Sequence, residues 1–221
     1  MSFRKNKIMK KFLFLLIIPI FFLTSCIEII EETTINKDKS GKVILGFDIA
    51  GVGFFLNAIG NYIDISLFNE IKALPNASEK ILKRISGIKN IKAVSNERKN
   101  LYSISFEFED TKALNKAYYK LFDYEKKWYE PKIIKISNNK IKKRNIAPFI
   151  RYYVKKEQKR IKEIDLLKKV KYKSIYHLPD EVKKVSNPRA KVSKNKRTVT
   201  YECNIQELLN TKVDIGNKIK Y

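Results

Sequence analysis

The segment Tyr102–Glu109 alternates strictly between two kinds of side chain. Serines and glutamates alternate with a larger apolar set, which is Tyr102, Ile104, Phe106 and Phe108. Because successive side chains of a β-strand point to opposite faces, this period of two predicts a strand with one buried and one wet face. Asp110 can then cap a helix over about Thr111–Tyr124, whose apolar residues form one stripe. The sequence here predicts a sheet with a helix packed on its buried face.

The same arrangement recurs along the chain. Paired strands are predicted at 27–36 with 42–50, 91–98 with 101–109, and 132–137 with 140–146. Asparagine, aspartate and glycine occupy the intervening turns at 37–41, 99–100 and 138–139. Later strands are predicted at 171–178, 181–186, 190–192, 197–203 and 213–221, with a helical turn near 205–209. Repeated hairpins followed by helices predict an α+β fold, with antiparallel hairpins covered by helices on one face.

Three further helical segments are predicted from apolar spacing and from Pro and Gly. Residues 52–74 indicate short helices, broken near Gly60 and ended before Pro75. A new helix is expected to start at Ser78 and to end at Gly87. A long helix is expected over Phe149–Val170, after Pro148. The apolar residues of 52–74 either cover the sheet or form an exposed apolar lip.

The N-terminus has the three parts of an export signal. Five basic residues precede an unbroken apolar run, Phe12–Leu23, and small residues then lead to Cys26. The apolar run has 12 residues and contains Pro19, whereas a membrane span needs about 20. The alternative is an uncleaved signal anchor in which Cys26 is an ordinary cysteine.

The tetrapeptide Leu23-Thr24-Ser25-Cys26 resembles the lipobox of bacterial lipoprotein precursors. The resemblance implies cleavage between Ser25 and Cys26, and a diacylglycerol thioether with further acylation, such as palmitate, on Cys26. The mature chain would then be an exported, membrane-anchored protein of the cell envelope, facing the periplasm. Ile27 follows the cysteine in place of the aspartate that acts as an inner-membrane retention signal in enteric bacteria. This mildly favours the outer membrane over the inner membrane.

Removing 25 of the 221 residues leaves 196, enough for one domain or two small ones packed together. We divide the mature chain into a charge-balanced α+β half, 26–125, and a basic α+β half, 126–221, expected to pack as one domain. Residues 126–200 hold 25 Lys and Arg against 6 Asp and Glu. The lysine-rich composition of proteins from AT-rich genomes explains many of these residues, but it does not explain their concentration in one stretch.

Four basic residues of the predicted long helix are spaced to share one face. They are Arg151, Lys155, Lys159 and Lys162. Such a row predicts contact with an anionic partner: phospholipid headgroups, lipopolysaccharide phosphates or an acidic polymer. Tyr152 and Tyr153 beside it could stack on bases, but export makes nucleic acid a poor candidate.

The sequence contains no recognisable catalytic or metal-binding motif. His177 is the single histidine and is expected to be a surface or packing residue, and Cys203 is expected to be a buried thiol. Glu107 and Glu109 fall on the wet face of one strand, where carboxylates are ordinary. We therefore expect no enzyme, no metal and no cofactor apart from covalent lipid on Cys26.

The layout also resembles uncharacterised envelope lipoproteins of AT-rich Bacteroidota, in the lipobox, the turn with Asn36, Asp38, Ser40 and Gly41, and the late strand-rich segment. We expect a lipid-anchored envelope protein with a binding or scaffolding role, whose basic surface (126–200) faces an anionic partner. The alternative is a carrier of a lipid or small apolar ligand in a cavity between sheet and helices.

Overall fold

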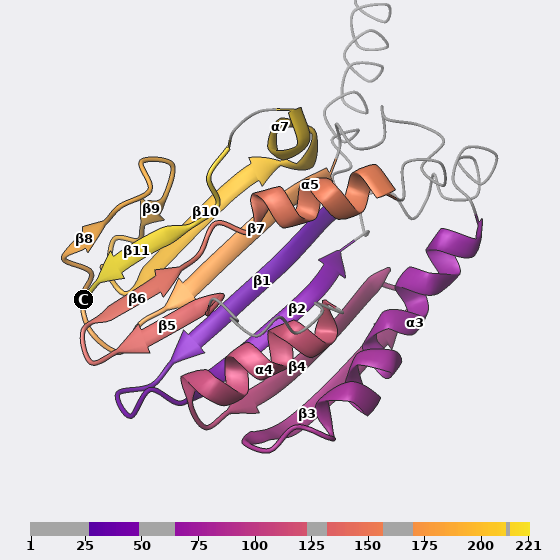
Figure 1. Cartoon of the computed structure of the whole chain (residues 1–221), viewed down its shortest axis with the longest axis horizontal. Coiled ribbons are helices and arrows are strands. Elements are labelled where there is room, and N and C mark those ends of the chain that lie inside the picture. Colours follow the sequence, from indigo (N-terminus) through magenta and orange to yellow (C-terminus); the bar gives the residue numbers. More distant parts are fainter. Residues whose placement is uncertain (1–26, 49–64, 123–131, 157–169, 211–212) are drawn as a thin grey trace, which may run out of the picture.

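The computed structural model describes residues 27–48, 65–122, 132–156, 170–210 and 213–221 (Figure 1). The predicted signal segment, its cleavage site at Ser25 and the acceptor Cys26 lie outside these ranges. Within the described residues, no helix is both long enough and apolar enough to cross a membrane.

Seven strands of the described residues form one large sheet. They are β1 (Ile27–Ile35), β2 (Gly41–Asp48), β3 (Ile88–Asn96), β4 (Leu101–Phe108), β7 (Val170–His177), β9 (Lys191–Val192) and β10 (Thr198–Asn204). Their order is β3-β4-β2-β1-β7-β10-β9. Every neighbouring pair is antiparallel except β1 and β7, which are parallel. The β1–β7 pair places strands from both halves of the chain side by side at the centre of this sheet.

In the described part of the chain, four helices and a second, smaller sheet cover one face of the large sheet (Figure 1). The helices are α3 (Ile65–Leu82), α4 (Thr111–Leu121), α5 (Ala147–Lys156) and α7 (Ile205–Asn210). The small sheet contains β5 (Ile134–Ser137), β6 (Lys140–Lys143), β11 (Asn217–Lys220) and β8 (Lys184–Val185), in that order. The predicted α+β class, with hairpins covered on one face, is confirmed.

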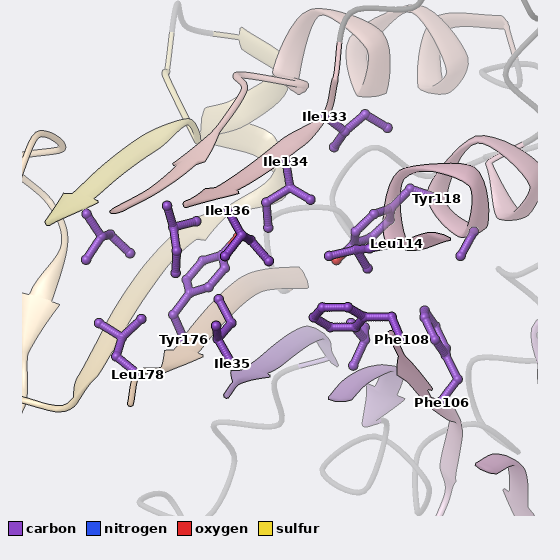
Figure 2. Close-up of a cluster of buried hydrophobic side chains, with 14 of the residues drawn as sticks. Ile35, Phe106, Phe108, Leu114, Tyr118, Ile133, Ile134, Ile136, Tyr176 and Leu178 are labelled. Atoms are coloured by element: carbon purple, nitrogen blue, oxygen red, sulfur yellow. The ribbon is translucent and has the colours of Figure 1, made fainter. Parts of the chain in front are cut away.

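The alternation seen in the sequence builds the core between these layers. In β4 the residues at 102, 104, 106 and 108 are buried, and their neighbours are partly exposed. Phe106 and Phe108 face Leu114 and Tyr118 of α4, while Ile134 and Ile136 of β5 extend the same cluster (Figure 2). Large side chains in this cluster are almost completely removed from water, and their burial stabilises the fold.

The predicted cap of α4 is confirmed. The Asp110 carboxylate accepts a hydrogen bond from the Ala113 backbone N–H at 2.7 Å, and Asp110 itself has extended dihedrals. The capped helix ends at Leu121, three residues earlier than expected.

Pro75 does not end a helix, contrary to the prediction. Helix α3 runs from Ile65 through Pro75 to Leu82, so no new helix starts at Ser78. A proline removes one intrahelical hydrogen bond, but packing can compensate for that loss. Pro75 is buried, Leu82 is fully buried in the core, and the Ser95 hydroxyl donates to the Lys72 carbonyl in the turn before the proline (3.3 Å).

The remaining boundaries differ in smaller ways. Helix α5 begins at Ala147, so Pro148 lies in its first turn, where its missing N–H costs nothing. The helix is described to Lys156, and the rest of the expected helix to Val170 includes residues outside the described ranges. Strand β11 spans only Asn217–Lys220 rather than 213–221, and β8 and β9 have two residues each.

Candidate ligand-binding site

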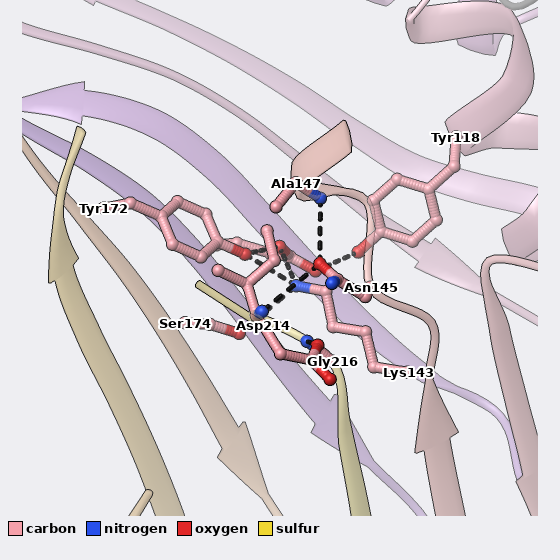
Figure 3. Close-up of polar contacts among 10 residues, drawn as sticks. Tyr118, Lys143, Asn145, Ala147, Tyr172, Ser174, Asp214 and Gly216 are labelled. Atoms are coloured by element: carbon pink, nitrogen blue, oxygen red, sulfur yellow. Dashed lines mark hydrogen bonds and ion pairs between the residues drawn. The ribbon is translucent and has the colours of Figure 1, made fainter. Parts of the chain in front are cut away.

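A buried carboxylate, Glu31, lies at the centre of the covered face. It points inward from β1, the central strand, because it keeps the register of Ile27, Ile29 and Ile35. Its carboxylate accepts hydrogen bonds from Tyr118 (2.9 Å), Tyr172 (2.5 Å) and the Lys143 ammonium (2.5 Å) (Figure 3). The three donors come from α4, β7 and β6, so this one residue joins the large sheet to both layers that cover it.

Lys143 is as deeply buried as Glu31, and its ammonium group is fully hydrogen-bonded. Its ammonium donates to Glu31, to the Tyr172 hydroxyl (2.6 Å) and to the Ser174 hydroxyl (3.4 Å). It also lies 5.3 Å from the centroid of the Tyr172 ring and 5.9 Å from that of Tyr176, within range of cation–π attraction. These bonds use the three N–H donors of the ammonium, so the Glu31–Lys143 pair has a structural role and links the two sheets.

The electrostatics of the cluster favour the charged form of Glu31. Burial alone raises the pKa of Glu31, but the charge of Lys143 and hydrogen bonds from Lys143, Tyr172 and Tyr118 outweigh it and lower the pKa below its usual value. Burial, together with the Glu31 carboxylate, raises the pKa of Tyr118 and Tyr172 well above the ordinary value. The cluster therefore holds one ion pair and neutral tyrosines at neutral pH.

The connection from β6 to α5 is fixed beside this pair. The Asn145 side chain accepts hydrogen bonds from the backbone N–H groups of Ala147 (3.0 Å) and Ile215 (3.3 Å) (Figure 3). Gly216 lets the two segments approach, because a Cβ there would lie 2.8 Å from the Asn145 backbone nitrogen and 3.1 Å from the Lys143 carbonyl oxygen. These contacts position Ile146 and Ile150 at the start of α5.

Next to the Glu31 cluster, the space between the sheet and the helices is not filled. A partly enclosed cavity of about 400 Å³ lies there, on the β4-β2-β1-β7 part of the sheet. Its lining is almost entirely apolar. The lining residues are Ile29, Ile30, Glu31, Leu45, Gly46, Phe47, Tyr102, Ser103, Ile104 and Tyr172 from strands, and Leu74, Pro75, Ser78, Leu121, Phe122, Ile146, Ile150 and Ile205 from helices and adjoining turns.

Two of the cavity residues are unusually exposed for large apolar side chains. Leu74 on α3 is 42% exposed, and Phe122, which follows α4, is 37% exposed. The Phe122 ring stacks on Tyr118, with centroids 5.8 Å apart, so it is held in place at the cavity. Tyr118 also donates to Glu31, which connects this part of the wall to the buried ion pair.

The cavity fits small-molecule binding in size and chemistry. Binding sites for small molecules typically enclose about 300–1,000 Å³, with mostly apolar walls and a few polar groups. Glu31 is the one charged side chain among the described lining residues, and it is neutralised by Lys143. The walls therefore suit an uncharged chain or ring rather than a charged group.

The structure places the predicted basic row only in part. Arg151 lies on α5, partly buried, and its guanidinium donates to the Leu208 carbonyl of α7 (3.0 Å). Lys155 belongs to the same helix, while Lys159 and Lys162 lie outside the described residues. The row of four stays a prediction.

His177 is hydrogen-bonded on the surface of the large sheet, and Cys203 is buried in the core. The His177 ring bonds Glu32 (2.9 Å) and Thr198 (3.2 Å) on the outer face of the large sheet. Cys203 is buried, and burial raises the pKa of its thiol, which lowers its reactivity.

The two carboxylates of β4 and its adjoining residue have ordinary surface contacts. Glu107 accepts a hydrogen bond from Asn90, and Glu109 pairs with Lys89, as expected for solvated carboxylates. Among the described residues, no group of three or more His, Cys, Asp or Glu side chains could hold a metal ion.

Sequence reasoning missed Glu31 and Lys143, although each carried a signal. Both occupy inward positions of otherwise apolar alternations, Glu31 after Ile27 and Ile29, and Lys143 after Ile141. A charge at an inward position needs an opposite charge nearby, because an unpaired buried charge is very unfavourable. Their mutual pairing could have been suspected, but a separation of 112 residues hides which charges meet.

Comparison with known proteins adds little. No protein-family model and no curated protein matches the chain. One solved structure, the NMR structure of the folded domain of Mycobacterium tuberculosis LppM, is similar at 8% identity and a TM-score of 0.40, covering 89% of this chain and 90% of that one. A TM-score below 0.5 is too low to establish a common fold.

Proposed function

We propose that this protein is a lipid-anchored envelope protein that binds a lipid chain or another small apolar ligand in the cavity beneath α3, α4 and α5. The observation that carries the proposal is the apolar cavity of about 400 Å³, which the sequence suggested only as an alternative. The role is binding, without a catalytic step. The anionic-partner hypothesis concerns a different surface and is independent of this one.

The position of the cavity relative to Cys26 supports a membrane source for the ligand. Ile27 begins β1 immediately after the predicted acylated cysteine, and Ile29 lines the cavity. Three residues of fully extended chain span at most about 11 Å. An anchor on Cys26 would therefore hold the cavity wall close to the bilayer, where acyl chains are abundant.

The energetics favour chains over headgroups. Each CH₂ group removed from water contributes about 0.8 kcal/mol, or roughly a fourfold change in affinity. A charged headgroup would find no unpaired counter-charge among the described lining residues, so it would stay at the mouth in contact with water. Affinity should therefore rise with chain length until the cavity is full.

Photo-crosslinking in membranes tests the proposal. Vesicles holding the full mature protein are given a diazirine-labelled fatty acid, and crosslinked peptides are mapped by mass spectrometry. We expect adducts in peptides that contain Leu45–Phe47 and Ile146–Ile150, with unlabelled fatty acids of eight to sixteen carbons competing more strongly as they lengthen. Adducts spread evenly over the surface, or competition that ignores chain length, would contradict the proposal.

A pair of neighbouring substitutions provides the matched control. Leu45 lines the cavity, whereas Ile44 is on the opposite face of the same strand. Leu45→Trp should fill the cavity and lower crosslinking at least tenfold, and Ile44→Trp should leave it unchanged. Equal crosslinking of both variants would show that the probe binds elsewhere.

The anchor has its own test. The intact mass of the membrane-extracted protein should lack the first 25 residues and carry an added diacylglycerol and acyl mass. Cys26→Ala should abolish both changes. A full-length, unmodified mass for the unsubstituted protein would instead indicate an uncleaved signal anchor.

A further inference from the structure

The outward face of the small sheet carries lysines on all four strands. They form two cross-strand rows, one of Lys135, Lys142 and Lys218, and the other of Lys140, Lys220 and Lys184. Five of these side chains are exposed and Lys140 is partly exposed. We call these six residues the lysine face. Neighbouring strands lie about 4.8 Å apart, so each row brings like charges close together.

Among the described residues, no carboxylate forms an ion pair with the lysine face. Strands β5, β6, β11 and β8 contain no Asp or Glu, and none of the six ammonium groups pairs with a carboxylate of the described residues. Nearby Glu181 pairs with Lys196 instead (4.0 Å). Like charges directly across a sheet are destabilising, so the arrangement does not serve the fold.

On the outer face of the large sheet, solvent-exposed positions are not filled with lysine alone. There, Lys173 pairs with Glu202 (3.5 Å) and His177 with Glu32 (2.9 Å). Both signs of charge are mixed on that face, as on an ordinary solvated surface. The lysine face is thus a local feature, which a lysine-rich composition does not explain.

The strands that carry the lysine face are anchored in the core by their inward-facing residues. The alternate residues of the same strands, Ile134, Ile136, Ile141 and Ile219, are buried in the core. The C-terminal residue Tyr221 is also buried, with its backbone N–H bonded to the Asn139 carbonyl (3.0 Å) and its hydroxyl to the Ser137 carbonyl (3.2 Å). An anion bound here would meet six charges whose positions are fixed at the backbone.

The location argues against the bilayer that holds the anchor. The second row is joined to the loop after β7, because the Lys183 N–H bonds the Lys220 carbonyl (2.8 Å). Strand β7 begins beside Ile27 and spans eight residues, about 26 Å. Figure 1 shows the C-terminus and β8 at the end of the molecule away from the start of β1. That separation exceeds the Debye length at physiological ionic strength, about 8 Å.

We propose that the lysine face binds a linear polyanion, a phosphate- or carboxylate-bearing polymer outside the anchoring membrane. Ammonium groups on flexible stems act as point charges and suit a chain of repeated anions better than one planar ligand. Binding of this kind weakens steeply with added salt, because it depends on charge attraction. This inference is independent of the cavity and of its ligand.

The test uses the full mature protein in nanodiscs of neutral phosphatidylcholine, with inorganic polyphosphate and poly-glutamate as probes. The variant Lys135→Gln/Lys142→Gln/Lys218→Gln removes one row. The matched control, Lys112→Gln/Lys116→Gln/Lys120→Gln, removes the same charge from the exposed side of α4. At low salt we expect the row variant to weaken binding at least tenfold and the control less than twofold, with binding to at least one polymer.

Melting temperature shows whether the row variant is folded, and it should equal or exceed that of the unsubstituted protein because like-charge repulsion is relieved. Preference for polyphosphate or for poly-glutamate identifies which anionic group is recognised. Equal weakening by both triple variants would mean that net charge alone attracts the polymer, and would overturn the proposal. The proposal would also be overturned if neither polymer binds and the lysine face instead binds phosphatidylglycerol vesicles.

Discussion

The two ends of the covered sheet face are built differently. At the end near the β1–β2 turn, Val43, Phe106 and Phe108 pack against Leu114 and the small sheet without exposure. At the end where β1 begins, Leu45, Phe47 and Ile29 stand under helices that leave about 400 Å³ unfilled. Strands β1, β2 and β4 run through both ends with the same alternation of inward and outward residues, so this alternation does not cause the difference. The difference comes from what covers the strands, and it separates a region that stabilises the fold from one that can receive a ligand.

Glu31 and Lys143 lie where these two ends meet. The pair bonds the central strand to the small sheet on the packed side, while Glu31 and Tyr172 also contribute to the cavity wall. A cavity needs a firm boundary to remain open, because close packing otherwise favours collapse. We infer that the ion pair and its tyrosines provide that boundary.

The largest expected effect contrasts side-chain truncation at the two ends. Phe106→Ala should lower the free energy of unfolding by about 4 kcal/mol, because the fully buried ring leaves a void that its neighbours cannot close. Leu45→Ala, at a wall that already borders empty space, should cost about 2 kcal/mol or less. Urea unfolding of both variants measures the difference, and equal losses would mean that the two ends are equally packed.

The next effect concerns the boundary itself. Lys143→Met should destabilise the fold by about 3 kcal/mol, since it leaves Glu31 buried without its counter-charge. Glu31→Gln/Lys143→Met should recover much of that loss, because no buried charge then remains. If the double variant is as unstable as the sum of the two single variants, the pair is not coupled as the geometry indicates.

A smaller effect is expected from acid. The folded-state pKa of Glu31 is below its unfolded value, so its contribution to stability is complete above the unfolded pKa, near 4.5, and is lost as pH falls through the folded pKa. Denaturation followed between pH 6 and pH 3 should show this loss. In Glu31→Gln the slope of stability against pH should be shallower over that range, and an unchanged slope would assign the acid sensitivity to other carboxylates.

Much of the fold follows from local sequence signals. Period-two alternation and turn residues placed the three hairpins, and Asn100 indeed takes the positive φ (49°) that asparagine tolerates in turns. Asp110 marked the start of α4 because a cap acts within one turn of its helix. These features depend on residues a few positions apart, and so a single sequence contains them.

The rest depends on contacts between distant residues. The parallel pairing of β1 with β7 joins residues more than 140 positions apart, and no local pattern marks it. Helix α3 continues through Pro75, whose burial depends on tertiary packing that the local sequence does not show. The cavity has no signature in the sequence, since its apolar lining is identical in kind to the packed core. What distinguishes it is the spacing of layers, which only the assembled fold determines.

The most direct test of a ligand-binding cavity is the native mass of the membrane-extracted protein and of its variants Leu45→Trp and Ile44→Trp. We predict that the unsubstituted protein and Ile44→Trp carry an additional acyl-lipid mass that organic extraction removes, distinct from any covalent lipid on Cys26, and that Leu45→Trp lacks it. Absence of this mass from all three proteins, or its equal presence in all three, would contradict ligand binding in this cavity.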